Sequence, residues 1–262
     1  MKTHLVVDYI VLWLKTYAER ANVKGFVIGV SGGIDSAVTS TLCAETGLPL
    51  LCLEMPIHQG ENQVNRAKEH IDQLKQRYKN VSSKEINLTN TFETFKQAVP
   101  QVEENDTVFM SRANTRARLR MTTLYYFAGL NGYLVAGTGN KVEDFGVGFF
   151  TKYGDGGVDL SPIADLMKSE VYDIAEVLKV PASIMKAKPT DGLFGDSRSD
   201  EDQIGASYDE LEWAMNEADK GKTARDFNGR KKEVFEIYNY RNRANKHKMI
   251  PIPVCEIPKE LK

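Results

Sequence analysis

The sequence predicts an α/β protein built on a doubly wound, mostly parallel sheet with flanking helices. Two observations support this fold class. Short apolar runs alternate with helical patterns through the first two thirds of the chain, as in folds built from parallel strands. The first run passes directly into a glycine-rich turn and then a helix, and in such sheets ligands bind at the carboxyl ends of the strands. We therefore expect the loops that follow residues 30, 55 and 138 to form the functional edge.

The N-terminal segment is expected to be a buried amphipathic helix over residues 5–17. It resembles a signal peptide superficially, because it combines a basic start with an apolar run. However, Asp8 interrupts that run and no small-residue cleavage site follows it, so the segment is interpreted as part of the folded protein.

The other elements follow from periodicity. A helical face is clearest where Val64, Ala67, Ile71, Leu74 and Tyr78 recur at spacings of three and four residues. Buried parallel strands are predicted where short runs are almost wholly apolar. The expected strands are residues 26–30, 50–55, 85–88 and 133–138, and the other expected helices are residues 36–45, 92–98, 114–130 and 171–178.

The last third of the chain is organised differently. Residues 191–205 are rich in Gly, Ser and Asp, which predicts a mobile loop that orders when substrate binds. Residues 221–248 are strongly basic and are expected to be partly helical. No internal repeat and no clean boundary divides the sequence, so residues 1–262 are predicted to form a single domain with a substantial core.

Composition excludes several classes of protein. Hydrophobic residues make up 42% and charged residues 27% of the chain, which excludes a disordered or fibrous protein. The net charge is −2, and acidic residues 200–219 balance basic residues 230–248, so no nucleic-acid partner is expected. No apolar run reaches the ~18 residues of a membrane span, so no membrane partner is expected either. Cys43, Cys52 and Cys255 form no CxxC pair, which argues against a disulfide framework and for a reducing, cytoplasmic location.

The glycine-rich turn after the first strand is the most informative segment. Glycines let a backbone approach a ligand closely, and free N–H groups at a helix start favour an anion such as phosphate. Asp35 would repel a phosphate unless a cation lay between them, so its presence predicts bound Mg²⁺. The turn matches neither the Walker A nor the GxGxxG pattern. The predicted nucleotide-binding residues of this turn are Gly29, Val30, Ser31, Gly32, Gly33, Ile34, Asp35 and Ser36.

An arginine-rich helix supplies a second candidate. Arg112, Arg116 and Arg120 recur every four residues and form one helical stripe, which is expected to be a solvated face. Arg118 lies about 200° around the helix from its arginine neighbours, so it is the arginine predicted to contact a ligand.

Glu143 is the third candidate, because it lies just beyond the predicted strand 133–138. From there it is expected to face Asp35 as a second Mg²⁺ ligand. The many glycines between residues 146 and 157 indicate a loop that closes over a ligand.

The SGGxDS pattern of residues 31–36 resembles the pyrophosphate loop of the N-type ATP pyrophosphatases. That superfamily cleaves ATP between its α and β phosphates and activates an acceptor oxygen as an adenylate. Three segments narrow the resemblance to the ammonia-dependent NAD synthetases: FTKYGDGGVD (150–159), KPT (188–190) followed after a loop by DE (200–201), G (205) and YDE (208–210), and HKMIPIP (247–253). The similarity runs from about residue 23 to the HKMIPIP segment and implies the adenine nucleotide alpha hydrolase-like fold.

The resemblance implies roles for the residues that match the family's motifs. The glycine-rich loop would hold the phosphates of ATP, with Asp35 and Glu143 as Mg²⁺ ligands. The implied ATP contacts are Thr138, Lys168 and Thr190, and the implied contacts to deamido-NAD are Arg118, Lys152, Asp159, His247 and Lys248.

The reaction implied by the resemblance has two steps. The nicotinate carboxylate of deamido-NAD attacks the α-phosphorus of ATP and pyrophosphate leaves; ammonia then attacks the acyl carbon and AMP leaves. The Gly32 and Gly33 amides, Lys168 and the Mg²⁺ held by Asp35 are expected to stabilise charge on the leaving pyrophosphate in the first step. Asp159 is expected to collect the ammonium proton in the second step. Free ammonia, or ammonia from a separate partner protein, is the expected donor, because no glutaminase domain fits before Gly29 and no cysteine lies in an amidase-like motif.

Other interpretations stay open at this point. Amidation of nicotinate mononucleotide uses the same carboxylate, so motifs around ATP do not separate it from the dinucleotide reaction. Another ATP pyrophosphatase, such as a GMP synthetase core or a tRNA thiolase, and a non-catalytic ATP sensor are less consistent with the segments named above.

The sequence departs from the family's motifs at two places, and the resemblance also implies an oligomeric state. The family often reads GTDHAAE where residues 137–143 read GTGNKVE, and one extra residue follows Glu143 before the GFFTK run. Residues 196–202 also lack the family's usual SPGQ-like wording. The family typically forms a homodimer, which is expected here because residues 5–17 and 125–127 carry more apolar side chains than one core needs.

Overall fold

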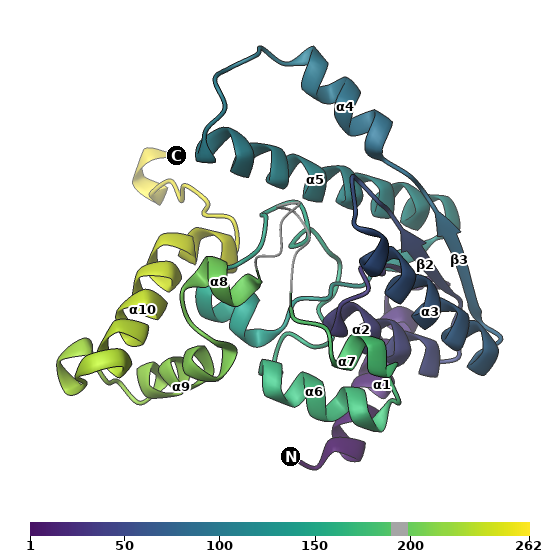
Figure 1. The fold of residues 1–262 in the computed structure, drawn as a ribbon, viewed down its shortest axis with the longest axis horizontal. Helices are drawn as coiled ribbons and strands as arrows, with labels where there is room; N and C mark the ends of the chain where they lie inside the picture. Colours follow the sequence, from purple (N-terminus) through teal and green to yellow (C-terminus); the bar gives the residue numbers. More distant parts are fainter. Residues whose placement is uncertain (190–198) are drawn as a thin grey trace.

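The fold is built on a four-stranded parallel sheet, which lies on the right-hand side of the view in Figure 1. The structure is a computed structural model that describes residues 1–189 and 199–262. The strands are β1 (Gly25–Gly29), β2 (Leu50–Glu54), β3 (Val81–Glu85) and β4 (Tyr133–Val135), in the order β3–β2–β1–β4. In the parallel register, Val27 of β1 lies between Leu51 of β2 and Val135 of β4. The predicted α/β fold with a parallel sheet is confirmed.

Helices cover both faces of this sheet, because successive side chains of a strand point to opposite sides. Phe26 and Ile28 of β1 pack into one hydrophobic cluster, and Val27 packs into another on the opposite face. The first face carries α1 (Thr3–Arg20), α2 (Ile34–Glu45), α3 (Glu61–Arg77), α6 (Lys168–Val177) and α7 (Ala182–Met185), and the second carries α4 (Thr89–Ala98) and α5 (Asp106–Asn131).

A third hydrophobic cluster lies beside the sheet and forms a helical lobe (Figure 1). Val142, Leu211 and Phe235 are among its fully buried side chains. The lobe consists of the π-helix η1 (Val142–Val147), α8 (Asp200–Ile204), α9 (Tyr208–Asp219), the short η2 (Ala224–Asp226) and α10 (Gly229–Met249). A tail with the 3-10 turn η3 (Lys259–Leu261) follows α10.

The extra residue after Glu143 coincides with the π-helix. A π-helix closes i→i+5 rather than i→i+4 hydrogen bonds, so its turn holds one residue more than an α-helical turn. Gly148 ends it with a φ of +65°, and a Cβ there would lie 2.4 Å from Cβ of Asn245. The insertion is therefore absorbed locally, next to Glu143.

Two sequence predictions about elements were wrong. The strand expected at residues 85–88 is β3, Val81–Glu85, whose sequence VSSKE lacks an apolar run because it is a half-exposed edge strand. The segment expected to be a loop over residues 191–205 ends in the helix α8, held by a capping box between Ser199 and Asp202; residues 190–198 lie outside the described part.

Within the described residues, no helix has the length and hydropathy needed to cross a membrane.

The N-terminal helix was predicted correctly in type but is longer than expected. One face of α1 is buried through Val7, Ile10, Leu14 and Ala18, whereas its opposite face leaves Tyr9 exposed. The other helices also match their predicted positions and extend beyond them, most of all α5, which begins eight residues before the predicted start at residue 114.

Candidate active site

A cavity of about 530 Å³ lies at the carboxyl ends of β1 and β2. The loop between β1 and α2 forms part of its wall, together with residues of α3, α5 and α6 and with the lobe residues Glu143 and Lys248. This is the edge at which parallel sheets bind ligands. All eight residues predicted in the glycine-rich turn, Gly29 to Ser36, line the cavity, as does Thr138.

The glycine-rich turn is held by its own hydrogen bonds. The Ser36 hydroxyl donates to the carbonyl of Gly33 at 2.9 Å, and the Ser31 hydroxyl accepts from the N–H of Gly33 at 3.2 Å. Gly32 has a φ of +80°, and a Cβ there would lie 2.5 Å from the carbonyl oxygen of Gln63. The Arg66 guanidinium also donates to the Gly32 carbonyl at 3.1 Å. The turn is thus pressed against α3 and needs glycine at position 32.

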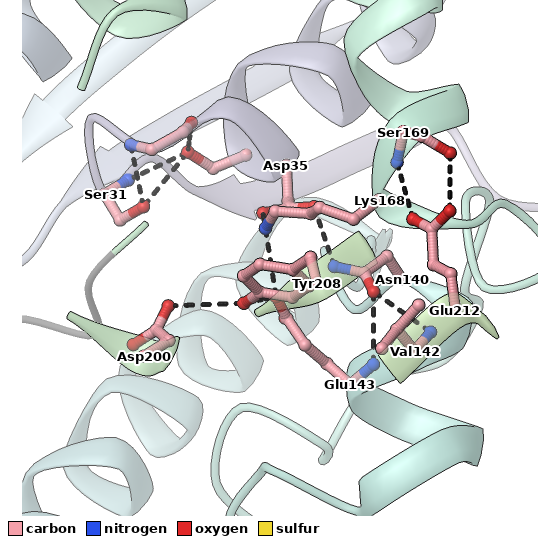
Figure 2. Close-up of polar contacts among 12 residues, drawn as sticks. Ser31, Asp35, Asn140, Val142, Glu143, Lys168, Ser169, Asp200, Tyr208 and Glu212 are labelled. Carbon is pink, nitrogen blue, oxygen red and sulfur yellow. Dashed lines mark hydrogen bonds and ion pairs between the residues drawn. The ribbon is translucent and has the colours of Figure 1, made fainter. Parts of the chain in front are cut away.

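A buried ion cluster lies beside this turn (Figure 2). Lys168 Nζ lies 2.6 Å from Asp35 Oδ2 and 2.9 Å from Glu143 Oε1. The Lys168 side chain is 4% exposed, whereas Asp35 and Glu143 are 18% and 17% exposed. These residues come from α2, η1 and α6, which are far apart in the sequence. The structure therefore brings together the two predicted metal ligands and the predicted phosphate lysine.

The electrostatics of the cluster follow from this arrangement. Burial would lower the pKa of Lys168, but the two carboxylates outweigh it and hold that pKa above its usual range. Burial would raise the pKa of Glu143, yet the Lys168 ammonium and the Tyr208 hydroxyl keep it below its ordinary value. Burial raises the pKa of Asp35 above its ordinary value, although the Lys168 ammonium opposes this shift. Lys168 and Glu143 are therefore held in their charged forms.

The cluster fits a divalent cation that is shared with a nucleotide. Asp35 and Glu143 present carboxylate oxygens to one positive charge, which here is the ammonium of Lys168. Among the described residues, no group of three or more His, Cys, Asp or Glu side chains is gathered to hold a metal ion. Mg²⁺ typically binds through one or two carboxylates together with substrate phosphates, and this donor set matches that pattern.

Three residues of the cluster were missed by the sequence analysis. Asn140 donates to Asp35 Oδ1 at 3.0 Å and accepts from the Glu143 N–H at 3.1 Å. Tyr208 donates to Glu143 Oε1 at 2.5 Å and lies 3.5 Å from Asp200 Oδ2. Asn140 occupies the position of His in the family's GTDHAAE motif, and that departure was a signal. Asp200 and Tyr208 belong to the DE…G..YDE segment used to identify the family, but the sequence analysis gave neither residue a role.

The predicted dinucleotide contacts form a second group, which is exposed. Arg118 Nη2 donates to the Lys152 carbonyl at 3.4 Å, and Lys152 Nζ donates to the His247 carbonyl at 2.8 Å. Neither Arg118, Lys152 nor His247 is among the residues that line the cavity. Lys248 does line it, and its ammonium donates to the carbonyls of Gly148 and Phe150. The structure thus joins α5, the 150–159 loop and the end of α10.

Asp159 forms its hydrogen bonds with residues outside both groups. Its Oδ2 accepts from the Val135 N–H at 2.8 Å, and its Oδ1 accepts from the Tyr125 hydroxyl at 3.0 Å. Both oxygens are therefore engaged at the end of β4. Thr190, the remaining predicted ATP contact, lies outside the described residues.

The prediction that the arginine stripe on α5 is a solvated face was wrong. Arg112 forms an ion pair with Glu104 at 2.6 Å, and Arg116 stacks over the Phe92 ring at 5.4 Å. Arg120 donates to the carbonyl of Met55 at 3.0 Å. The stripe is a packing face, because it fastens α4 and the loop after β2 to α5.

Comparison with known proteins places this site in a family. The model of the NAD synthase family matches residues 6–251. The NH(3)-dependent NAD(+) synthetase of Mesoplasma florum is 41% identical over 207 residues, covering 78% of this chain and 81% of that protein. The enzyme of the same name from Syntrophomonas wolfei is 33% identical over the whole of both chains.

Solved structures agree with this placement. An NMN synthetase from Francisella tularensis superposes with a TM-score of 0.83 at 31% identity, covering 99% of both chains. An NH3-dependent NAD synthetase from Campylobacter jejuni, at 24% identity and a TM-score of 0.77, supports the fold. On its sequence and its fold, the chain belongs to the NAD synthase family.

Proposed function

We propose that this protein catalyses the ATP-dependent amidation of deamido-NAD to NAD with ammonia, releasing AMP and pyrophosphate. The observation that carries the proposal is the buried Asp35–Lys168–Glu143 cluster beside the glycine-rich turn, within one cavity. An ATP pyrophosphatase must neutralise charge on the leaving pyrophosphate, and this is where the fold supplies a lysine and two carboxylates. The family assignment supports the same reaction.

The residues act in the first step by positioning and by charge neutralisation. The N–H groups at the start of α2 and the Lys168 ammonium would contact the phosphates of ATP, and Thr138 and Thr190 would orient the nucleotide. Asp35 and Glu143 would hold Mg²⁺, which when bound supplies positive charge to the phosphate oxygens. For Lys168 to reach a phosphate, its ammonium must leave the carboxylates with which it pairs here.

The second step needs ammonia in place of ammonium at the acyl-adenylate. We propose that Asp159 takes up this proton, because its carboxylate lies at the end of β4, held by Val135 and Tyr125. Replacing Asp159 with Asn is expected to raise the apparent KM for ammonium between about pH 7 and pH 9. An unchanged KM across this range would remove Asp159 from the second step.

Free ammonia is proposed as the nitrogen donor, with residues 1–262 acting as one synthetase domain. Glutamine hydrolysis in related enzymes uses a nucleophilic cysteine. Cys43 and Cys52 are buried, and burial raises the pKa of the Cys52 thiol to about 12, so neither is a thiolate at neutral pH. Activity with ammonium but not with glutamine is the expected result.

The substrate contacts and the assembly belong to the same proposal. Arg118, Lys152, His247 and Lys248 would bind deamido-NAD. We propose a homodimer, because Leu5, Tyr9 and Leu12 of α1 and Tyr126 and Leu130 of α5 are between 61% and 70% exposed. We also propose a cytoplasmic location, since Cys255 is an exposed free thiol; light scattering and cell fractionation test these two points.

Amidation of nicotinate mononucleotide is a second candidate. The structural match to the Francisella tularensis NMN synthetase over 99% of both chains favours it. Both reactions use one carboxylate and one ATP site. The deciding assay offers deamido-NAD and nicotinate mononucleotide separately, with ATP, Mg²⁺ and ammonium. AMP and amide from the dinucleotide support the main proposal, preference for the mononucleotide supports the alternative, and no AMP with either overturns both.

A further inference from the structure

Tyr208 contacts the buried cluster from the helical lobe (Figure 2). Its side chain is 6% exposed. Its hydroxyl donates to Glu143 Oε1 at 2.5 Å, and its ring centroid lies 4.7 Å from Lys168 Nζ. One aromatic side chain therefore contacts both a predicted metal ligand and the predicted phosphate lysine.

The position of Tyr208 is fixed by its own helix rather than by the cluster. Tyr208 is the first residue of α9, whose start is held by a capping box between Ser207 and Glu210. Arg230 donates to both oxygens of Glu210 at 2.8 and 2.7 Å. The Tyr208 N–H donates to Glu201 Oε1 at 2.8 Å. The hydroxyl is thus presented to Glu143 from a rigid support.

The same helix also fixes the start of the helix that carries Lys168. Glu212, one turn after Tyr208, accepts from the Ser169 N–H at 2.8 Å and from the Ser169 hydroxyl at 2.7 Å (Figure 2). Helix α9 therefore sets the distance between Glu143 and α6. Neither of these contacts of α9 is made through the Lys168 ammonium.

The hydrogen bond from Tyr208 gains importance once Lys168 leaves the carboxylates. Glu143 Oε1 accepts from both Lys168 Nζ and the Tyr208 hydroxyl. When the ammonium turns to a phosphate, the hydroxyl still restrains this carboxylate. A ligand carboxylate that is held by such a partner binds a metal ion more tightly, because its orientation is already fixed.

We propose that Tyr208 is a positioning residue that orients Glu143 for the divalent cation and so sets the affinity of the nucleotide-bound site for that cation. This inference rests on the proposed function, because it assumes that Glu143 is a metal ligand. It assigns a role to the tyrosine at the start of α9, for which the sequence analysis named none.

The test removes the hydroxyl alone. Tyr208→Phe is loaded with an ATP analogue that has a methylene group between its α and β phosphates, and Mn²⁺ binding is followed by electron paramagnetic resonance. Loss of such a partner typically weakens metal affinity about 10-fold or more, and we expect about 10-fold here. With saturating Mg²⁺, the KM for ATP is expected to stay near that of the wild type.

Tyr238→Phe is the matched control, because Tyr238 is also 6% exposed and packs in the same hydrophobic cluster. It is expected to leave Mn²⁺ affinity unchanged. Both variants are titrated at a temperature at which circular dichroism shows them fully folded, so a difference in stability does not affect the comparison.

A double-variant cycle separates positioning from general packing. In a Glu143→Gln background, Tyr208→Phe is expected to have no further effect on Mn²⁺ affinity, because its action runs through the carboxylate. Equal affinities for wild type and Tyr208→Phe, or an equal loss in both backgrounds, would overturn the inference. If the wild type binds Mn²⁺ with the analogue yet lacks amidation activity, only the proposed reaction fails.

Discussion

The two groups of candidate residues differ in how the protein holds them. Asp35, Glu143 and Lys168 are mostly buried and joined by short ion pairs. Arg118, Lys152 and His247 are connected through hydrogen bonds to backbone carbonyls on an open surface. The first group has its geometry fixed by three packed elements, whereas the second is held by few side-chain contacts, each to a backbone carbonyl.

The difference in burial determines how strongly the charged side chains of each group depend on their partners. In the buried cluster, a charged group without a partner costs free energy. The carboxylates therefore need a cation beside them, either the Lys168 ammonium or a bound Mg²⁺. In the exposed group, water solvates each side chain and surface contacts contribute little to stability. Substitutions in the buried group should therefore change stability and turnover together, and substitutions in the exposed group should change only substrate affinity.

Lys168→Met should have the largest effect on turnover. It removes the ammonium that would neutralise charge on the leaving pyrophosphate, and loss of one such group typically lowers kcat about 10²- to 10³-fold. Steady-state release of AMP at saturating ATP measures this loss. A decrease below 10-fold would show that the buried cluster is not the phosphate site.

The same variant should also lose stability when no metal is present. Asp35 and Glu143 would face each other without a cation, and breaking such a pair costs about 3 kcal/mol. Urea unfolding in EDTA should show this loss, and added Mg²⁺ should reduce it, because the two carboxylates would then bind the metal. Equal stability with and without Mg²⁺ would contradict the stand-in role of the ammonium.

Gly32→Ala should damage the turn that borders the buried cluster. The residue has a φ of +80°, and the new Cβ would lie 2.5 Å from the Gln63 carbonyl, so we expect a loss of about 2 kcal/mol in the free energy of unfolding. Gly60→Ala is the control, because its φ is −67° and its new methyl group would have no atom within 4 Å. Denaturant titration of both variants should separate them clearly.

The stability of the folded protein should decrease as the pH is lowered, because of a buried histidine on α3. His70 is fully buried and lies 2.8 Å from the Ser40 hydroxyl of α2. Burial lowers the pKa of His70 to about 4 from 6.5. The unfolded chain therefore takes up a proton below pH 6.5 that the folded protein does not, so the stability present above pH 6.5 is lost towards pH 4.

Between pH 7.5 and pH 5, this histidine should account for a loss of about 2 kcal/mol. Comparison of urea unfolding for the wild type and His70→Gln at both values measures it, and the variant should show a smaller pH dependence. His4→Gln is the control, since His4 is exposed on α1. A pH dependence that is identical in all three proteins would exclude His70 as the source.

Arg118→Ala should give the smallest effect. Loss of a hydrogen bond from a charged side chain to a substrate should raise the KM for the nicotinate substrate about 10-fold, with little change in kcat or in the KM for ATP. The thermal midpoint should stay at the wild-type value, because the side chain is exposed. A large loss of stability would remove the distinction between the two groups.

The main features of the fold could be predicted from local pattern. Short apolar runs and periodic helices identified three of the four strands: β1 and β2 are buried and therefore apolar, and β4, which is half-buried at the other edge of the sheet, is also apolar. The position of edge strand β3 was not predicted correctly, since its sequence VSSKE has no apolar periodicity. It pairs with β2 through backbone hydrogen bonds, which leave no pattern in the sequence. The helix α8 was not predicted, because it has only five residues, is stabilised by its N-terminal cap, and lies in a segment whose Gly-, Ser- and Asp-rich composition is typical of a loop.

The sequence by itself determined the fold class and the family, and it identified candidate residues of the site: a glycine-rich turn after a strand, the aspartate of that turn, and the glutamate and lysine that match the family's motifs. Only the tertiary structure decided that Lys168 pairs with both carboxylates and that Tyr208, Asn140 and Asp200 surround them. The physical reason is distance along the chain. Side chains that share one strand or helix leave a periodic signal, whereas Lys168 meets Asp35 across 133 residues, through packing that no local pattern records.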